Sequence, residues 1–231
     1  NFTGSLTIPN NVTSIGDYAF TSCDFIGSLT IGNSVTSIGR NAFSQCYFTG
    51  SLIIPNSVTY IGDEAFNCYD LTDIFFYRNE SPTIYSYTFD YLNSNAKIYA
   101  PVIWESFTNI PEDNLVKMPT WTSQQVWVGL AEGQIEPGEN EHVAINAPME
   151  LSRQVNILKV KSFGYCGDGT TTNGSITIEE GGQLYCETAR GEVTVRKEIL
   201  GYQQSGSESE SKWYTIASPL KDVTSTSLVS G

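Results

Sequence analysis

The sequence predicts a mainly β protein in which a repeat solenoid is followed by a second β-rich module. The solenoid is predicted by the string GSLTIPNNVTSIGDYAF at residues 4–20, which returns with few changes at 27–43 and 50–66. The second module is predicted by short runs of alternating apolar and polar residues after residue 118, separated by glycine-rich and acidic turns. A chain of 231 residues is long enough for two such units.

The repeats are expected to stack on one another. Leu6, Leu29 and Leu52 follow one another at intervals of 23 residues. A period of about 20 to 29 residues is typical of leucine-rich repeats, in which each unit is too small to bury its own apolar face. We therefore expect about four 23-residue repeats, each with a front strand and a short helical or irregular segment behind it.

Within one repeat, the apolar positions predict which side chains face the core. Ile26, Leu29 and Ile31 have the L-x-x-L-x-L spacing of a short strand whose apolar side chains point inward. Ala42 and Phe43 are expected to pack inward from the back segment.

A fourth repeat keeps the spacing, with Leu71, Ile74 and Phe76 at the strand positions, and the solenoid is expected to end near Lys97. A short helix is predicted from Pro101, because proline is favoured at the first helical position. Its apolar face would cover the last repeat with Ile103, Trp104 and Phe107.

The repeated string A-F…C…L-x-x-I-x-I-P…V-x-x-I-G resembles the BspA-like leucine-rich repeats of bacterial surface proteins, over roughly residues 1–110. The resemblance implies an adhesive protein that binds host proteins or other cells, with no catalytic residue. Gly32 stands where the pattern has proline, and Thr3 and Thr49 stand where it has leucine. These departures are expected to loosen the packing locally without breaking the period.

The second half predicts a parallel β-helix-like module. Paired glycines at Gly181 and Gly182 suit either a sharp corner of such a helix or a hairpin turn. The segments VAINAPMEL, ITIEEGGQL, VTVRKEI and KWYTIASPL are similar to a β-helical module of large secreted Bacteroidetes-type proteins, which implies export. We predict two domains: 1–118, the solenoid with a C-terminal cap, and 119–231, a β-rich module truncated at its C-terminal end.

Charge and hydropathy exclude two classes of partner. The formal net charge of −13 should repel nucleic acid and anionic membrane surfaces. No run of about eighteen apolar residues is present, so we expect no membrane insertion. With the two resemblances, this predicts an extracellular location on the bacterial cell surface.

The five cysteines divide into two groups. Cys23, Cys46 and Cys68 occupy equivalent repeat positions. Side chains stacked in such a column run parallel, whereas a disulfide needs converging β-carbons, so buried thiols are expected there. Cys166 and Cys186 lie in the second half and would be able to pair.

The predicted ligand-binding residues are Ile53, Phe75 and Tyr77, which lie outward at one end of the front strands. An exposed apolar patch of this kind would bind a protein strand or a sugar ring. The alternative, which the need to cover solenoid ends favours, is that the cap or the second module buries the patch. A second aromatic group, expected to be half-buried rather than a glycan platform, consists of Tyr85, Tyr87 and Tyr91.

No catalytic set or metal site is predicted. The single histidine, His142, has no partner motif and is expected at the surface. A glycosidase pair among Asp168, Glu179 and Glu180 is disfavoured, because Glu179 and Glu180 are adjacent and face opposite sides of a strand. An acidic loop is expected instead of a calcium site, because no ligand-loop pattern organises Glu132, Glu136, Glu139 and Glu141.

Three functions therefore remain in view. The first is a non-enzymatic adhesion protein without a cofactor, whose repeat face binds host or bacterial surface proteins or glycans. The second is a structural spacer in a large surface protein. The third is a carbohydrate-active enzyme or its accessory polysaccharide-binding module, which requires a cleft where carboxylates converge.

Overall fold

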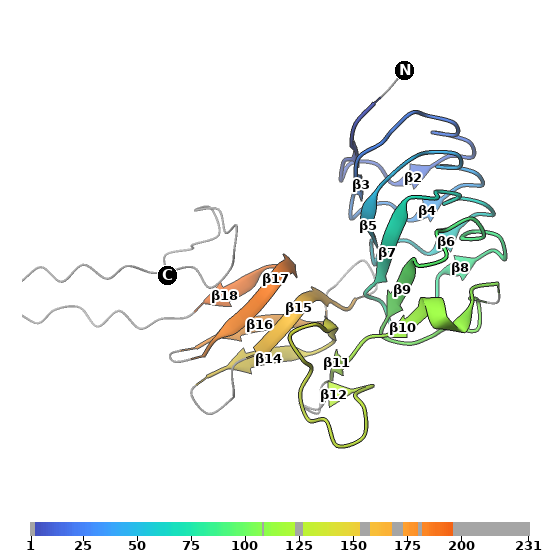
Figure 1. Ribbon diagram of the computed structural model, residues 1–231. Coiled ribbons are helices and arrows are strands. Elements are labelled where there is room, and N and C mark those ends of the chain that lie inside the picture. The colour runs from blue at the N-terminus through green and yellow to red at the C-terminus, as the bar shows by residue number, and fades with distance from the viewer. Residues whose placement is uncertain are drawn as a thin grey trace, which may run out of the picture.

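The computed structural model describes residues 3–107, 109–122, 127–152, 158–167, 173–179 and 182–195. Within these residues the chain forms eighteen strands and one 3-10 helix, η1 (Glu112–Asn114). The predicted mainly β class is confirmed. The N-terminal strands stack in one column, and the later strands form a second group beside the lower end of that column (Figure 1).

The solenoid carries two ladders of parallel strands. The front ladder is divided into two parallel sheets. The first pairs β1 (Leu6–Ile8) with β3 (Leu29–Ile31), and the second contains, in order, β5 (Gly50–Ile54), β7 (Leu71–Phe76), β9 (Lys97–Ala100) and β10 (Leu115–Lys117). The side ladder consists of β2 (Ser14–Ile15), β4 (Ser37–Ile38), β6 (Tyr60–Ile61) and β8 (Thr83–Ile84). Leu6 pairs with Leu29, and Ser14 pairs with Ser37, so the sequence period sets the register.

Phenylalanine rings form the spine of the solenoid core. Phe20, Phe43, Phe66 and Phe89 stack one on the next, with ring centroids 5.4, 5.5 and 5.8 Å apart. Each ring comes from the back segment of a successive rung, as the repeat pattern predicted. The back segments are turns rather than helices among the described residues.

One predicted core position is wrong. Ile26 is 60% exposed, and Phe25 is the buried residue at 6%. The strand begins only at Leu29, so the inward spacing does not extend back to residue 26. The larger ring of Phe25 stacks on that of Phe48, with centroids 5.5 Å apart.

The C-terminal end of the solenoid also differs from the prediction. The solenoid does not end near Lys97, because β9 pairs in parallel with β7 and β10 pairs in parallel with β9. The predicted helix from Pro101 is instead a series of turns. Trp104 and Phe107 are nevertheless buried and pack on Phe76, as a cap requires.

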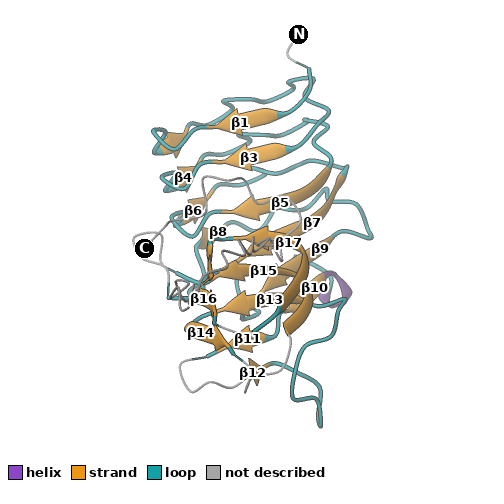
Figure 2. Ribbon diagram, turned by 90° about the vertical axis from the view of Figure 1, so that its left-hand side faces the viewer, coloured by secondary structure: helices purple, strands orange, loops and turns teal. Residues whose placement is uncertain are grey.

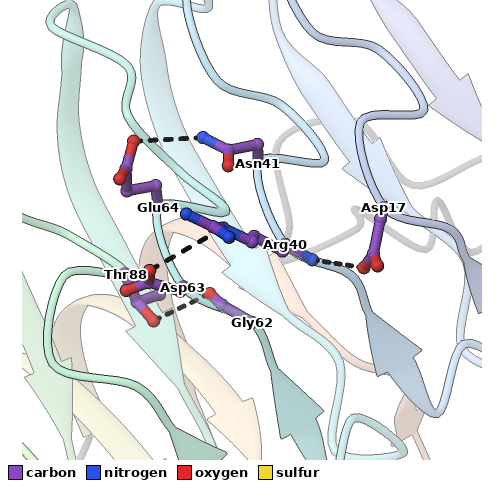
Figure 3. A network of polar contacts seen from close by, with 7 residues as sticks. All are labelled: Asp17, Arg40, Asn41, Gly62, Asp63, Glu64 and Thr88. Atoms are coloured by element: carbon purple, nitrogen blue, oxygen red, sulfur yellow. Dashed lines mark hydrogen bonds and ion pairs between the residues drawn. The ribbon is translucent and has the colours of Figure 1, made fainter.

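Polar groups join neighbouring rungs at the turns after the side ladder (Figure 3). The Oδ1 atom of Asp17 accepts a hydrogen bond from the backbone N–H of Arg40 at 2.7 Å. The buried hydroxyl of Thr88 donates to the carbonyl of Gly62 at 3.0 Å. These contacts satisfy backbone groups that the turns leave unpaired within their own rung.

All five cysteines are free thiols. The Sγ atom of Cys46 donates to the carbonyl of Phe20, and that of Cys68 donates to the carbonyl of Phe43. Burial raises the pKa of Cys46 to about 11 and raises that of Cys68 further. The expectation of buried thiols holds for these two, and Cys166 and Cys186 do not pair.

The second module is a parallel β-helix over its described residues. One sheet contains β11 (Thr120–Trp121), β12 (Trp127–Val128), β13 (His142–Ile145), β15 (Leu158–Tyr165) and β17 (Leu184–Arg190). The other contains β14 (Pro148–Leu151), β16 (Ser175–Ile178) and β18 (Val193–Val195). Every pairing is parallel except that of β11 with β12.

β16 and β17 belong to different sheets, so Gly182 lies at a corner of the β-helix and the hairpin alternative is excluded. Gly181 lies outside the described residues. A Cβ at Gly182 would lie 2.0 Å from the carbonyl oxygen of Leu151, so only glycine fits at this corner.

Candidate binding groove

The second module covers two of the three predicted ligand-binding residues. Phe75 is 1% exposed and Tyr77 is 3% exposed, whereas Ile53 is 38% exposed. The prediction of one exposed patch is therefore wrong for Phe75 and Tyr77, because the second module packs on the outward column of β7. We call this contact the junction, whose cluster contains Phe75, Tyr77, Met118, Ala144 and Cys166.

Gly164 allows the junction to close. A Cβ at this position would lie 2.5 Å from Cζ of Tyr77 and 2.6 Å from both Cε atoms. The phenol end of Tyr77 therefore lies directly against the backbone of β15. Any side chain at residue 164 would require the Tyr77 ring or the backbone of β15 to shift.

Replacing Gly164 by alanine is expected to lower the free energy of unfolding by about 1–3 kcal/mol, the usual cost of overpacking. Gly138 gives a matched control, because a Cβ there meets nothing within 4 Å. Gly138→Ala is expected to change stability by no more than about 0.5 kcal/mol. Urea unfolding followed by circular dichroism measures both variants, and equal stabilities would contradict the close junction.

The single histidine lies at the junction, half-buried rather than at the open surface. The Nδ1 atom of His142 is 2.7 Å from Oγ of Ser162. Its ring meets those of Phe75 and Tyr99 edge to face, with centroids 4.9 and 4.7 Å apart. Ser162 is 1% exposed, so a substrate cannot reach its hydroxyl and this Ser–His pair has a packing role.

Burial, together with the nearby charges of Lys161 and Arg190, lowers the pKa of His142 to about 4, and the charge of Asp73 opposes this shift. An unfolded histidine titrates near pH 6.5, so the unfolded state binds more protons between pH 6.5 and 4. The stability that depends on the neutral ring is therefore complete above pH 6.5 and is lost as the pH falls to about 4.

Lowering the pH from 7 to 4 is expected to cost about 1–2 kcal/mol through His142, after allowing for solvent screening of a half-buried ring. Urea unfolding at pH 7, 5.5 and 4.5 measures this, with His142→Gln as the reference. The difference between the two proteins should shrink as the pH falls. Parallel stability curves for the two proteins would show that the histidine does not titrate in this way.

A groove opens where the junction ends. The second module lies in front of the lower rungs and leaves β1 and β3 uncovered (Figure 2). The groove beside these rungs has a volume of about 980 Å³. One wall is formed by Ser28, Thr30, Ser51 and Ile53 of the solenoid, and the other by Thr188, Arg190 and Thr194 of the second module.

Arg190, at the end of β17, lies where the groove meets the junction. Its guanidinium Cζ is 4.0 Å from the ring centroid of Phe75. Its Nε and Nη1 atoms are buried without a hydrogen-bond partner among the described residues. The Tyr77 hydroxyl is also buried and lies beside Ser162 and Arg190, although it meets neither in good hydrogen-bond geometry. Burial raises the pKa of Tyr77 to about 12, and the charge of Arg190 and the two neighbouring polar groups oppose this shift.

Tyr165 shapes the second wall. Its hydroxyl donates to the carbonyl of Glu192 and accepts from the N–H of Ile176 at 3.1 Å. Burial raises the pKa of Tyr165 to about 12. Glu192 is the only acidic residue among the described residues that line the groove.

The sequence analysis missed Arg190 and Tyr165. Neither residue recurs at equivalent positions along the sequence, so no repeat pattern distinguishes it. Where the two side chains lie depends on how the two modules pack. The strand pattern places their backbones but carries no signal for a shared groove.

The other candidate sites show no assembled chemistry. No group of three His, Cys, Asp or Glu side chains that would hold a metal occurs in the part of the chain that the structure describes. The carboxylate of Glu139 pairs with Nζ of Lys159 at 3.0 Å on an exposed loop. Asp168 and Glu180 lie outside the described residues. The second aromatic group is exposed on the turns of the fourth rung and consists of Tyr85, Tyr87 and Tyr91.

A comparison with protein families finds a match to the BspA type leucine rich repeat region, in six copies over residues 2–117. The chain belongs to this family. The match ends at the last residue of β10, and β9 and β10 continue the sheet of β5 and β7, so both strands belong to the repeat array of this BspA-type solenoid. The expected resemblance is thereby confirmed for the first half.

No curated protein and no solved structure matches the chain. BspA-type repeats are those of surface or adhesion-type proteins, so the family supports a surface-associated repeat protein. No helix in the described ranges has the length and apolar character needed to cross a bilayer.

Proposed function

We propose that this chain is a non-enzymatic binding protein of the bacterial cell surface, which adheres to host or bacterial surface proteins or glycans. The observation that supports this function best is the open groove between the solenoid and the second module. A groove of about 980 Å³ is at the upper end of the range for small-ligand sites, which run from about 300 to 1,000 Å³.

The lining of the groove favours binding over catalysis. Its walls carry hydroxyl and amide side chains, and a single carboxylate lies among its described lining residues. Glycoside hydrolysis uses two carboxyl groups flanking the scissile bond. Nucleic acid is a poor partner, because the chain has a formal net charge of −13.

A screen of the full chain against arrays of matrix proteins and glycans tests this proposal. Thr30 lies outward on β3 in the groove wall, so Thr30→Trp should fill the groove without disturbing the core. Thr13→Trp is the matched control, because Thr13 is exposed and does not line the groove. Binding that survives Thr13→Trp and is lost in Thr30→Trp supports the proposal, and the absence of any groove-dependent binding overturns it.

One observation favours a structural spacer instead. The outward rings of Phe75 and Tyr77 are covered by the second module, as a spacer without a front binding face requires. The same screen separates the two functions, because a spacer binds no array component at concentrations where weak binders register.

A further inference from the structure

We propose that one edge of the solenoid binds an extended, lysine- or arginine-rich segment of a protein partner through exposed tyrosine rings and the carboxylates beside them. The rings belong to Tyr47, Tyr69 and Tyr91, which we call the tyrosine column. The column is separate from the groove, because none of its three residues lines the groove. The inference therefore goes beyond the proposed function and does not depend on it.

The repeat aligns the tyrosine column. Its members follow one another at intervals of 22 residues, and the first two come directly after Cys46 and Cys68. The Sγ atoms of these cysteines donate to carbonyls at equivalent positions of successive rungs, so the two tyrosines also occupy equivalent positions. The ring of Tyr91 meets that of Tyr69 edge to face, with centroids 6.1 Å apart. Rungs about 4.8 Å apart therefore bring the three rings into one row along the solenoid.

All three rings of the column are open to solvent. Tyr47, Tyr69 and Tyr91 are 51%, 52% and 46% exposed. Within the described part of the chain, no lysine or arginine side chain lies over any of them. Single exposed tyrosines need no explanation, whereas a contiguous exposed apolar row is typical of an interaction surface.

Carboxylates accompany the column. Asp70 follows Tyr69 and Asp90 precedes Tyr91, and both aspartates are exposed. Burial raises the pKa of Cys68, and the charge of Asp70 adds to this shift, so the carboxylate acts on the residue directly before Tyr69. Each of these two rungs therefore presents an aromatic ring together with a negative charge.

Basic residues do not offset these carboxylates. Over residues 1–96 the only basic residues are Arg40 and Arg78. Arg78 is buried and donates to backbone carbonyls, and Arg40 lies beside Asp63 on the turns after the side ladder. The edge that carries the column is therefore negative, which attracts a basic partner and repels an acidic one.

The second module contains the same combination of groups with its cation in place. The Nζ atom of Lys159 lies 5.8 Å from the ring centroid of Tyr185 and 3.0 Å from a carboxylate oxygen of Glu139. One ammonium group thus contacts the face of an exposed tyrosine and a carboxylate together, and both contacts favour the charged form. The tyrosine column offers the ring and the carboxylate without the cation.

The spacing of the rings fits an extended chain. Alternate side chains of a β-strand lie on one face, about 6.6 Å apart. This is close to the 6.1 Å between the rings of Tyr69 and Tyr91. A segment with basic residues at alternate positions therefore places successive cations over successive rings. A neutral glycan would stack on the rings but would leave the carboxylates without a charged partner, so the basic segment fits the edge better.

The test uses the full chain and a short fluorescent peptide in which lysine alternates with serine, and binding is followed by fluorescence anisotropy. The same peptide with every lysine acetylated is the charge control, because acetylation removes the cation. We expect only the lysine peptide to bind. Tyr69→Leu, which removes the ring and keeps an apolar side chain, should weaken binding about two- to fivefold, the value of one cation–π contact at an exposed site. The double variant with Tyr91→Leu should weaken it further.

Matched variants separate the column from the rest of the acidic surface. Tyr185 is 54% exposed, and its ring already has Lys159 over it, so Tyr185→Leu should leave peptide binding unchanged. Thr30→Trp, in the groove, should also leave it unchanged. Asp70→Asn should weaken binding and reduce its dependence on salt. The side chains of Tyr69 and Asp70 are exposed, so thermal unfolding of their variants should match that of the unsubstituted chain.

The outcomes that overturn this inference differ from those that overturn the proposed function. Equal peptide affinity in Tyr69→Leu and Tyr185→Leu overturns the inference, because net charge alone would then attract the peptide. The absence of saturable binding at millimolar peptide also overturns it, as does a neutral glycan that binds through Tyr69 more tightly than the peptide. Loss of peptide binding in Thr30→Trp but not in Tyr69→Leu would place the peptide in the groove, so the inference falls and the proposed function stands. A screen without groove-dependent binding overturns the proposed function, while peptide binding that needs Tyr69 leaves this inference standing.

Discussion

Replacing Phe66 by alanine is expected to lower the free energy of unfolding by about 3–5 kcal/mol. Phe66 is fully buried and stacks between Phe43 and Phe89, with ring centroids 5.5 and 5.8 Å away. Its removal leaves a cavity in the middle of the spine and deletes two aromatic contacts, each worth about 0.5–1.5 kcal/mol beyond area burial. The effect should exceed that of a terminal ring, because a solenoid is held together by contacts between neighbouring rungs.

Urea unfolding followed by circular dichroism measures this loss, and Tyr69→Ala provides the control in the same rung. Tyr69 is exposed, so its truncation should change stability by no more than about 0.5 kcal/mol. Phe20→Ala, at the N-terminal end of the described stack, should lie between the two. A loss below about 1 kcal/mol for Phe66→Ala would show that the aromatic spine does not hold the rungs together.

The repeat period explains why so much of the solenoid was predictable. A residue type that recurs every 23 positions marks a column in space, and neighbouring rungs confirm one another. Leu6 and Leu29 therefore pair as expected, and the four rings from Phe20 to Phe89 form one stack. The pattern failed at Ile26, because strand alternation was extended beyond the two or three residues that the strand occupies.

Features that occur once were not predictable in the same way. The sequence could indicate that Phe75 and Tyr77 point outward, but not whether the second module covers them. That outcome depends on Gly164, which lies 87 positions beyond Tyr77 and permits the contact by having no side chain. The groove at Arg190 follows from the same docking of two modules.

Arg78 is a second residue of this kind, and its truncation has the other large expected effect. The side chain is 6% exposed. Its Nη1 atom donates to the carbonyls of Asn56 and Val58 at 2.8 and 2.5 Å, and Nε donates to that of Glu80 at 2.7 Å. The Arg78 guanidinium thus joins the turn of the third rung to the fourth rung, which carries Arg78 itself.

Arg78→Met is expected to lower the free energy of unfolding by about 2–4 kcal/mol. It leaves the buried carbonyl of Val58 without its donor, at a cost of about 1–3 kcal/mol, and removes the part-buried hydrogen bonds to Asn56 and Glu80. Arg40→Met is the matched control: the Arg40 side chain is 54% exposed and its Nε lies 3.9 Å from Asp63, a surface ion pair worth at most about 1 kcal/mol. Arg78→Lys should be intermediate, because one ammonium group cannot reproduce the planar fork. Equal losses of unfolding free energy in Arg78→Met and Arg40→Met would contradict this prediction. The carbonyl contacts of Arg78 would then contribute no more than an exposed ion pair, and apolar stacking alone would hold the rungs together.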